Sequence, residues 1–434
     1  MPLKYQAPRG TRDLLPVEIG RWQWAEARAR GVLERYGYAE IRTPEFEESE
    51  LFARTSGETS DLVQKEMYRF RDLKGRDLAL RPEGTAGVCR AYLERNLAAR
   101  GRVHKLWYLG PMFRYGRPQK GRFRQFFQVG AEIIGTPAAA ADVEMVTLFV
   151  DLFRAWGFTG LTVALNSVGT PATREAYARQ LREWLAPVRE RLSADSQKRL
   201  ELNPLRVLDS KDEGDRALLE GRAGAGGALP RMLDVLDPES RAHWEQVLAG
   251  LAALAVPCEV DHGLVRGLDY YTRTAFEVHD RSLGAQSALG GGGRYDGLIE
   301  ALGGPPTPGV GFSIGLDRVL LALEDRAVTP PAPAPRVFVA GMEETHAEVA
   351  ALARALRAEF VVDYDFEARS LSTQLKAADR GGARVALLLG AEEWGRGEVL
   401  LRDLATKAQR AVPRGEIAAQ LRAMLGSAPE VSAR

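Results

Sequence analysis

Apolar and polar residues alternate with a period of two from residue 122 to residue 134, and this pattern predicts a β-strand. Its two faces hold Arg124, Phe126, Gln128 and Glu132 on one side and Phe123, Phe127, Val129, Ala131 and Ile133 on the other. The apolar side belongs in a core. The other side combines a cation, a flat ring, an amide and a carboxylate, which indicates a pocket for a charged, flat ligand that forms hydrogen bonds. A charged hairpin with a solvated polar face is the alternative for this stretch alone.

The residues before position 327 predict one long helix and several further strands. The helix covers residues 21–36, and strands are expected around residues 40–43, 67–71, 78–81, 103–113, 161–165, 270–278 and 311–315. Several turns between them are too short for a crossover helix, so the pattern favours a largely antiparallel sheet flanked by helices, an α+β fold. Residues 170–256 have a helical pattern instead, and we interpret them as an insertion into this first domain, residues 1–326.

A second domain follows a proline-rich segment. Residues 327–335, AVTPPAPAP, contain four prolines and predict a semi-rigid linker. Strand and helix patterns then alternate over residues 336–425, which predicts an α/β domain that ends in a helix starting at Pro413. Residues 426–434 are expected to be a frayed tail.

Composition narrows the class of protein. The chain has 434 residues, 45% of them hydrophobic and 27% charged, with a formal net charge of +1, as expected of a globular protein with more than one domain. Two cysteines and five scattered histidines make a metal site built by the protein improbable. The start, MPLKYQAPRGTRDLLP, has no apolar targeting segment and no apolar run is long enough for a membrane span, so we expect a cytoplasmic protein.

Positive charge is concentrated in one segment. Side chains of Arg114, Arg117, Lys120, Arg122 and Arg124 precede the next acid, Glu132, and this local excess requires an anionic partner.

A carboxylate stands at a predicted strand end in LRPEGTAGVCRAYL, residues 80–93. Glu83 could accept hydrogen bonds from a ligand amine, and Thr85 could cap the helix that follows. The alternative is that Glu83 only complements the dipole at the helix N-terminus.

Two other segments combine arginine with glycine or tyrosine. Arg266 precedes Tyr270 and Tyr271, and a permanent cation beside two phenols suits an anion. The run Gly290–Gly293, followed by Tyr295, would let the backbone approach a ligand, although a glycine-rich hairpin turn is the alternative. In GVGFSIGLDRVLLAL, residues 309–323, a strand leads into a core helix whose first turn holds Arg318, either for a phosphate or acidic partner or as a simple surface arginine.

Together these segments resemble the histidyl-tRNA synthetases, a family of class II aminoacyl-tRNA synthetases. APRGTRDLLP resembles the family's opening, and GYAEIRTPEFE, FRYGRPQKGRFRQF and GVGFSIGLDRVLLAL resemble motifs 1, 2 and 3 of the class. RGLDYYT and ALGGGGRYDGL resemble the two histidine-specific segments. LDSK, residues 208–211, and the C-terminal α/β domain resemble the family's helical insertion and anticodon-binding domain.

The resemblance implies a role for each candidate residue. It implies that histidine is bound by Glu83, Gly84, Thr85, Gln128, Glu132, Arg266, Tyr270, Tyr271 and Tyr295, and ATP by Arg114, Arg122, Phe126 and Arg318. Arg114 and Arg266 would be catalytic, Arg117 and Gln119 would meet the acceptor end of tRNA(His), and residues 390–394 with Arg402 would read the anticodon. The implied reaction joins L-histidine to tRNA through a histidyl-adenylate, with Mg²⁺ arriving with ATP, and motif 1 implies a homodimer.

Two positions depart from the family pattern, Gly116 where glutamate is usual and Phe127 where histidine is common. The alternative functions are a histidine-sensing regulatory relative without catalysis and another class II synthetase. Neither explains the C-terminal domain and the paired tyrosines together as well as a histidine enzyme does.

Overall fold

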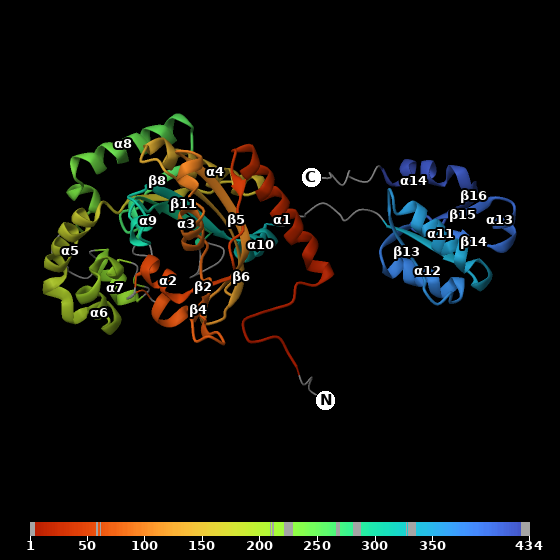
Figure 1. Cartoon of the computed structure of the whole chain (residues 1–434), viewed down its shortest axis with the longest axis horizontal. Coiled ribbons are helices and arrows are strands. Elements are labelled where there is room, and N and C mark those ends of the chain that lie inside the picture. Colours follow the sequence, from red (N-terminus) through yellow and green to blue (C-terminus); the bar gives the residue numbers. More distant parts are fainter. Residues whose placement is uncertain are drawn as a thin grey trace. The chain divides into compact units, whose positions relative to one another are not determined.

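The computed structural model describes residues 5–57, 60, 62–208, 210, 212–220, 229–265, 270–280, 288–326, 328 and 336–426. The chain divides into two compact units, residues 1–330 and 331–434 (Figure 1). The predicted linker, apart from Val328, and the tail beyond Gly426 lie outside the described residues.

An eight-stranded sheet forms the centre of the first unit, in the order β1-β5-β6-β11-β10-β9-β7-β8. The strands are β1 (Ala39–Glu40), β5 (His104–Phe113), β6 (Gln125–Ile134), β7 (Val163–Ser167), β8 (Cys258–Val260), β9 (Thr272–His279), β10 (Ala288–Arg294) and β11 (Gly309–Gly315). The expected antiparallel pairing is confirmed from β5 through to β7, whereas β1 with β5 and β7 with β8 are parallel pairs.

Helices cover one face of this sheet. They are α1 (Pro16–Arg35), α4 (Ala139–Ala155) and α10 (Leu316–Asp325). Helix α1 places Trp22, Ala25, Ala29 and Val32 on one stripe, and these bury against α4, which is apolar on nearly all sides. The odd-numbered residues Val129 to Ile133 of β6 point into the same core, as the alternation predicted. Among the described residues, α3 (Thr85–Glu94) and α9 (Leu298–Ala301) pack on the opposite face, and the site lies on that face.

A helical insertion separates β7 from β8. It contains α5 (Pro171–Leu185), α6 (Ala194–Leu202), α7 (Glu213–Leu219) and α8 (Pro238–Ala253). Each of these helices follows a residue whose side chain accepts a backbone N–H of the first turn: Thr170, Ser193, Asp212 and Asp237. Such caps satisfy donors that a helix start otherwise leaves open, so the sequence sets the start of each helix locally.

Three short strands near the N-terminus form a separate sheet in the order β2-β4-β3, and do not extend the central one. They are β2 (Phe46–Glu48), β3 (Arg69–Arg71) and β4 (Asp77–Leu80), accompanied by α2 (Ser49–Ser56) and a π-helical turn, Leu62–Glu66. The sequence pattern predicted β3 and β4 but not β2.

The second unit is a five-stranded sheet in the order β13-β12-β14-β15-β16. Its elements are β12 (Arg336–Gly341), α11 (His346–Leu356), β13 (Val361–Tyr364), α12 (Leu371–Arg380), β14 (Ala383–Leu389), α13 (Ala391–Gly395), β15 (Glu398–Asp403), β16 (Gln409–Pro413) and α14 (Ile417–Leu425). The prediction that Pro413 begins the last helix is wrong. It ends the edge strand β16, where a missing N–H is tolerated, and α14 starts after one 3₁₀ turn.

Candidate active site

On the face of the central sheet opposite α1 and α4, glycines occupy neighbouring positions of β6, β11 and β10. We call them the glycine floor. A Cβ added to its glycines would overlap larger side chains that rest on the sheet: Gly130 meets the Tyr108 ring, Gly309 the Tyr295 ring, Gly311 the Glu132 carboxylate and Gly293 the Tyr271 ring. Gly84, at the start of α3, meets the Tyr108 ring from the other side. The glycines therefore make room for one carboxylate and three aromatic rings.

The run Gly290–Gly293 contributes Gly293 to this floor. It forms most of strand β10 between β9 and β11, so the interpretation as a hairpin turn is wrong. Glycine is depleted in strands on average. Here a Cβ at Gly293 would meet the Tyr271 ring, and a Cβ at Gly290 or Gly292 would meet backbone atoms of the neighbouring strand β11.

Glu132 is the centre of the site. Its side chain has no exposure, and its two oxygens accept the hydroxyl protons of Thr85 and Tyr295, each at 2.7 Å. Burial raises the pKa of Glu132 to about 8, although the two hydroxyls oppose that rise. The carboxyl group is therefore mostly protonated near neutral pH when no ligand is present, and a cationic or N–H donor ligand would favour its ionised form.

Glu83 caps helix α3. Its oxygens accept the backbone N–H groups of Thr85 at 2.7 Å and Ala86 at 2.9 Å. The prediction that Thr85 caps the helix is thus wrong, because the Thr85 hydroxyl points to Glu132 instead. Burial raises the pKa of Glu83, and the two N–H groups oppose this. Each oxygen keeps a lone pair, so the capping role and a contact to a ligand amine are compatible.

Two buried polar atoms of the site lack a hydrogen-bond partner among the described residues, the Tyr108 hydroxyl and Gln128 Oε1. Gln128 was expected in the site. Its amide nitrogen lies 3.5 Å from the Ser313 hydroxyl. Tyr108 was missed. Only the register of β5 against β6, which sets Tyr108 directly opposite Gly130, places it in the site. Unpartnered buried polar atoms are costly, and a polar ligand would remove that cost.

The three tyrosines expected from the sequence meet in one cluster. The rings of Tyr270 and Tyr271 lie 4.7 Å apart, and those of Tyr270 and Tyr295 lie 6.0 Å apart at 77°. Burial raises the pKa of Tyr270 and of Tyr295, so both stay neutral hydroxyls. Each hydroxyl can donate a hydrogen bond to a polar ring or accept one from it.

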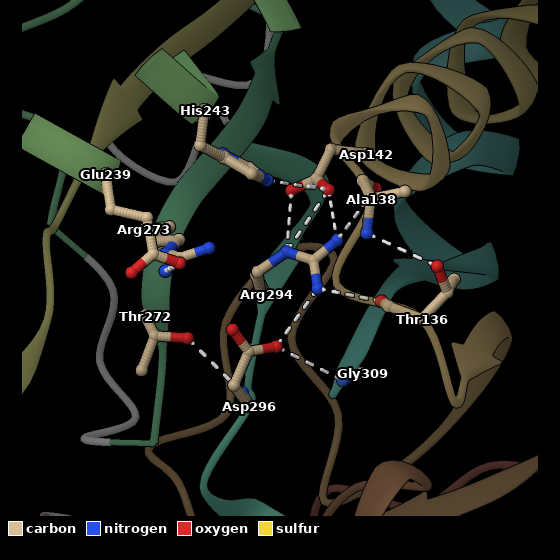
Figure 2. A network of polar contacts seen from close by, with 10 residues as sticks. All are labelled: Thr136, Ala138, Asp142, Glu239, His243, Thr272, Arg273, Arg294, Asp296 and Gly309. Atoms are coloured by element: carbon tan, nitrogen blue, oxygen red, sulfur yellow. Dashed lines mark hydrogen bonds and ion pairs between the residues drawn. The ribbon is translucent and has the colours of Figure 1, made fainter. Parts of the chain in front are cut away.

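Arg294 is the last residue of β10, directly before Tyr295 in the sequence, and Figure 2 shows its polar contacts. Its guanidinium is fully buried, pairs with Asp142 of α4, and donates to the carbonyls of Thr136 and Ala138 and to Asp296. Such complete pairing is what a buried charge needs. Arg294 was also missed in the sequence, since its partner lies more than 150 residues away.

The helical insertion contacts the same region. Arg174 of α5 donates to the Tyr271 carbonyl at 2.9 Å, and Glu239 of α8 pairs with Arg273 at 2.6 Å. His243 of α8 lies 3.3 Å from Asp142, beside Arg294 (Figure 2). The insertion therefore supports the strand that leads out of the tyrosine cluster.

A second group of expected residues combines cations with a ring. The Arg114 guanidinium lies 5.4 Å from the Phe126 ring centre and donates to the Pro82 carbonyl at 2.8 Å. Burial lowers the pKa of Arg318, and the nearby charges of Arg122 and Arg114 lower it further. Three cations that repel one another beside a flat ring suit a nucleoside phosphate.

The remaining expected residues are Arg266, Arg117 and Gln119. Arg266 falls outside the described residues, as do Asp209 and Lys211 of the LDSK segment. Arg117 and Gln119 are exposed on the loop between β5 and β6, away from the buried group. The part of the chain that the structure describes shows no cluster of three or more His, Cys, Asp or Glu side chains that could hold a metal ion.

The departures from the family pattern have different surroundings. Phe127 faces the core and packs edge-on against Trp22 at 5.1 Å, so no polar group is lost from the site there. Gly116 lies next to the Arg122 guanidinium, which pairs with Glu66 at 2.6 Å. Glu66, from another segment, thus gives Arg122 a carboxylate partner. A glutamate at position 116 would adjoin the same guanidinium.

Comparisons with known proteins agree over nearly the whole chain. Residues 10–319 match the family model described as histidyl-tRNA synthetase, and residues 336–424 match the anticodon binding domain. The histidine-tRNA ligase of Thermosynechococcus vestitus is 48% identical over 414 residues, 95% of each chain, and that of Desulforudis audaxviator is 48% identical over 417 residues, 96% of this chain and 98% of the relative.

Solved structures agree as well. Apo histidyl-tRNA synthetase of S. aureus superposes with a TM-score of 0.79 at 34% identity, covering 96% of this chain and 99% of that one. An ATP phosphoribosyltransferase regulatory subunit/histidyl-tRNA synthetase from Bacillus halodurans gives a TM-score of 0.64 at 22% identity, covering 88% and 97%, and shares the fold alone. Within the described residues, no helix is long and apolar enough to cross a membrane.

Proposed function

Because the chain belongs to the histidyl-tRNA synthetase family, we propose that the pocket around Glu132 binds L-histidine and that the arginines beside Phe126 bind ATP. The enzyme ligates histidine to tRNA at the expense of ATP, and its fold is that of the class II synthetases. The observation that carries the assignment of the pocket is a buried Glu132 surrounded by hydroxyl groups, next to two polar atoms that await partners.

Histidine fits the polarity of this pocket. The imidazole donates a ring N–H to Glu132, and the Tyr271 hydroxyl meets the other ring nitrogen while Tyr270 lines the site. The α-ammonium group meets Gln128 Oε1 and the free lone pairs of Glu83, near Thr85 and Tyr295. A ligand without a ring N–H cannot supply this hydrogen bond to Glu132, so such an analogue is rejected by about 10⁴-fold or more.

The arginines would then serve the first chemical step. The histidine carboxylate attacks the α-phosphorus of ATP, a new P–O bond forms, and the bond to the bridging oxygen of the leaving pyrophosphate breaks. Arg114 and Arg266 stabilise the charge that develops, whereas Phe126 and Arg318 enclose the adenine and Arg122 adds a phosphate contact. Mg²⁺ enters as part of the ATP substrate and neutralises phosphate charge.

Transfer to tRNA follows without a nucleophile from the protein. The ribose hydroxyl at the 3′ end attacks the acyl carbon of histidyl-adenylate, and AMP leaves. Arg117 and Gln119, which are exposed on the loop between β5 and β6, would contact the acceptor strand. In the second unit, α13 and β15 would contact the anticodon of tRNA(His), where the Trp394 ring is covered by Arg414 and the Arg402 side chain lies on β15.

The remaining assignments concern assembly and location. We assign residues 1–326 to catalysis with the insertion at 170–256, and residues 336–425 to the anticodon. A homodimer would form through motif 1, and a sedimentation measurement that gives a monomer would overturn this. We place the enzyme in the cytoplasm, where a fluorescent fusion protein would be found.

Pyrophosphate exchange tests the function directly. With each of the standard amino acids in turn, exchange of labelled pyrophosphate into ATP should depend on histidine. Binding of histidine without exchange would identify a regulatory sensor, and exchange with threonine, proline or glycine would identify another synthetase of the class.

A further inference from the structure

Three side chains of the loop between β5 and β6 are exposed at every second residue. They are Tyr115, Arg117 and Gln119, whereas Gly116 and Pro118 between them are partly buried. All three side chains are therefore accessible to a partner. Tyr115 is the unexpected member, because it presents a large ring where charged and amide groups would suffice for solubility.

Tyr115 is held in place although 53% of its surface is exposed. Its backbone N–H donates to the Glu66 carbonyl at 2.6 Å. The Arg124 guanidinium lies 3.8 Å from the ring centre, and the Tyr68 ring approaches at 5.5 Å with an angle of 77°. The ring is thus supported from the protein side and open on the other.

Arg124 is itself fixed by the N-terminal segment. Its backbone N–H donates to the Gly10 carbonyl at 2.7 Å, and its Nε donates to the Gly116 carbonyl at 3.4 Å. Gly10 has a φ of +87°, and a Cβ there would lie 2.7 Å from Arg124 Cγ. The arginine under the Tyr115 ring therefore has little freedom, unlike a solvated surface pair.

We propose that Tyr115 is a stacking platform for an unpaired base in the 3′-terminal strand of tRNA. A ring backed by a guanidinium attracts the flat face of a base, and such stacking is the usual way proteins hold single-stranded RNA. The local positive charge from Arg114 to Arg124 attracts the phosphates of the same strand. A ring that is already rigid loses little entropy when the base arrives. This inference rests on the proposed function and adds the residue that would orient the acceptor strand between Arg117 and the adenylate.

The test compares Tyr115→Leu with Tyr115→Phe in the full-length enzyme. Leucine keeps a smaller apolar side chain without a ring, whereas phenylalanine keeps the ring and serves as the matched control. We expect Tyr115→Leu to lower kcat/KM for tRNA by about 5- to 150-fold, and Tyr115→Phe to stay within about twofold of the wild type. Histidine-dependent pyrophosphate exchange should be unchanged in both, because that reaction needs no tRNA.

A spectroscopic measurement shows the contact itself. Placing 2-aminopurine in turn at the unpaired 3′ positions of a tRNA transcript should reveal one position whose fluorescence is quenched on binding to wild type and to Tyr115→Phe, but not to Tyr115→Leu. Tyr115→Leu with wild-type kcat/KM for tRNA would overturn the proposal, and so would a loss of exchange equal to the loss of aminoacylation. Absence of exchange in the wild type would instead refute the proposed function.

Discussion

Replacing Glu132 by glutamine should stabilise the substrate-free protein while it destroys histidine activation. Glutamine has the same shape and can keep the contacts to the Thr85 and Tyr295 hydroxyls. Folding raises the pKa of Glu132 from an ordinary 4.5 to about 8, so the folded protein binds the carboxyl proton of Glu132 more tightly than the unfolded chain does. The stability tied to this proton is complete below pH 4.5 and is lost as the pH rises toward 8.

The size of the effect follows from the interval between pH and the ordinary pKa. Relative to pH values below 4.5, the wild type loses about 3 kcal/mol of its free energy of unfolding at pH 7 and about 4 kcal/mol near pH 8. Glutamine remains neutral and avoids the loss. The free energy of unfolding of Glu132→Gln should therefore match the wild type near pH 4.5 and exceed it by about these amounts at pH 7 and 8.

Urea unfolding between pH 5 and 8, followed by tryptophan fluorescence, measures this difference. All tryptophans except Trp394 belong to the first unit, so the signal reports mainly on the unit that holds Glu132. Glu259→Gln, which changes an exposed carboxylate on β8, is the control and should show no such trend. A difference that does not change with pH, or a variant less stable than the wild type at pH 7, would refute the reasoning.

Three further predictions concern catalysis. Arg266→Ala should abolish histidine-dependent pyrophosphate exchange and leave the circular dichroism spectrum unchanged, and near-normal exchange would contradict the catalytic role. Removing residues 336–434 should spare exchange but weaken aminoacylation, so equal charging of tRNA by the truncated protein would argue against an anticodon role. Glu66→Gln should raise KM for ATP about fivefold, because Arg122 loses the carboxylate that orients it. Adding Gly116→Glu should recover part of that loss, since position 116 adjoins the same guanidinium, and KM values equal to wild type in Glu66→Gln would show that the pair does not position Arg122.

The sequence predicted the architecture and most of the site where local periodicity carries the information. The alternation along β6 placed Gln128 and Glu132 on one face and Val129, Ala131 and Ile133 on the other, as the structure has them. The predicted strand began too early, because β6 starts at Gln125 and Phe123 and Arg124 precede it. The resemblance to synthetase motifs then supplied residues from distant segments that no periodicity joins. Tyr270, Tyr271 and Tyr295 do meet in one cluster.

What the sequence left undetermined depends on pairing between distant segments. The buried Arg294 pairs with Asp142, and no sequence pattern near either residue predicts this pairing. Tyr108 could be placed only with the register of β5 against β6. The cap of α3 was assigned to Thr85 on local preference, but its hydroxyl serves Glu132 and leaves the helix N–H groups to Glu83.

The glycine floor under Glu132 and the tyrosines limits how this pocket can be altered. The floor consists of backbone atoms, which a substitution does not replace. Any larger residue at Gly130, Gly309 or Gly311 would overlap a side chain that rests there. An engineer who wants the enzyme to accept a different amino acid must therefore work from the walls, at residues such as Thr85 or Tyr271, and leave the base of the pocket untouched. The same constraint favours inhibitors that lie flat against the sheet, because a substitution in the floor that blocks such an inhibitor would also displace Glu132 or a tyrosine of the proposed histidine pocket.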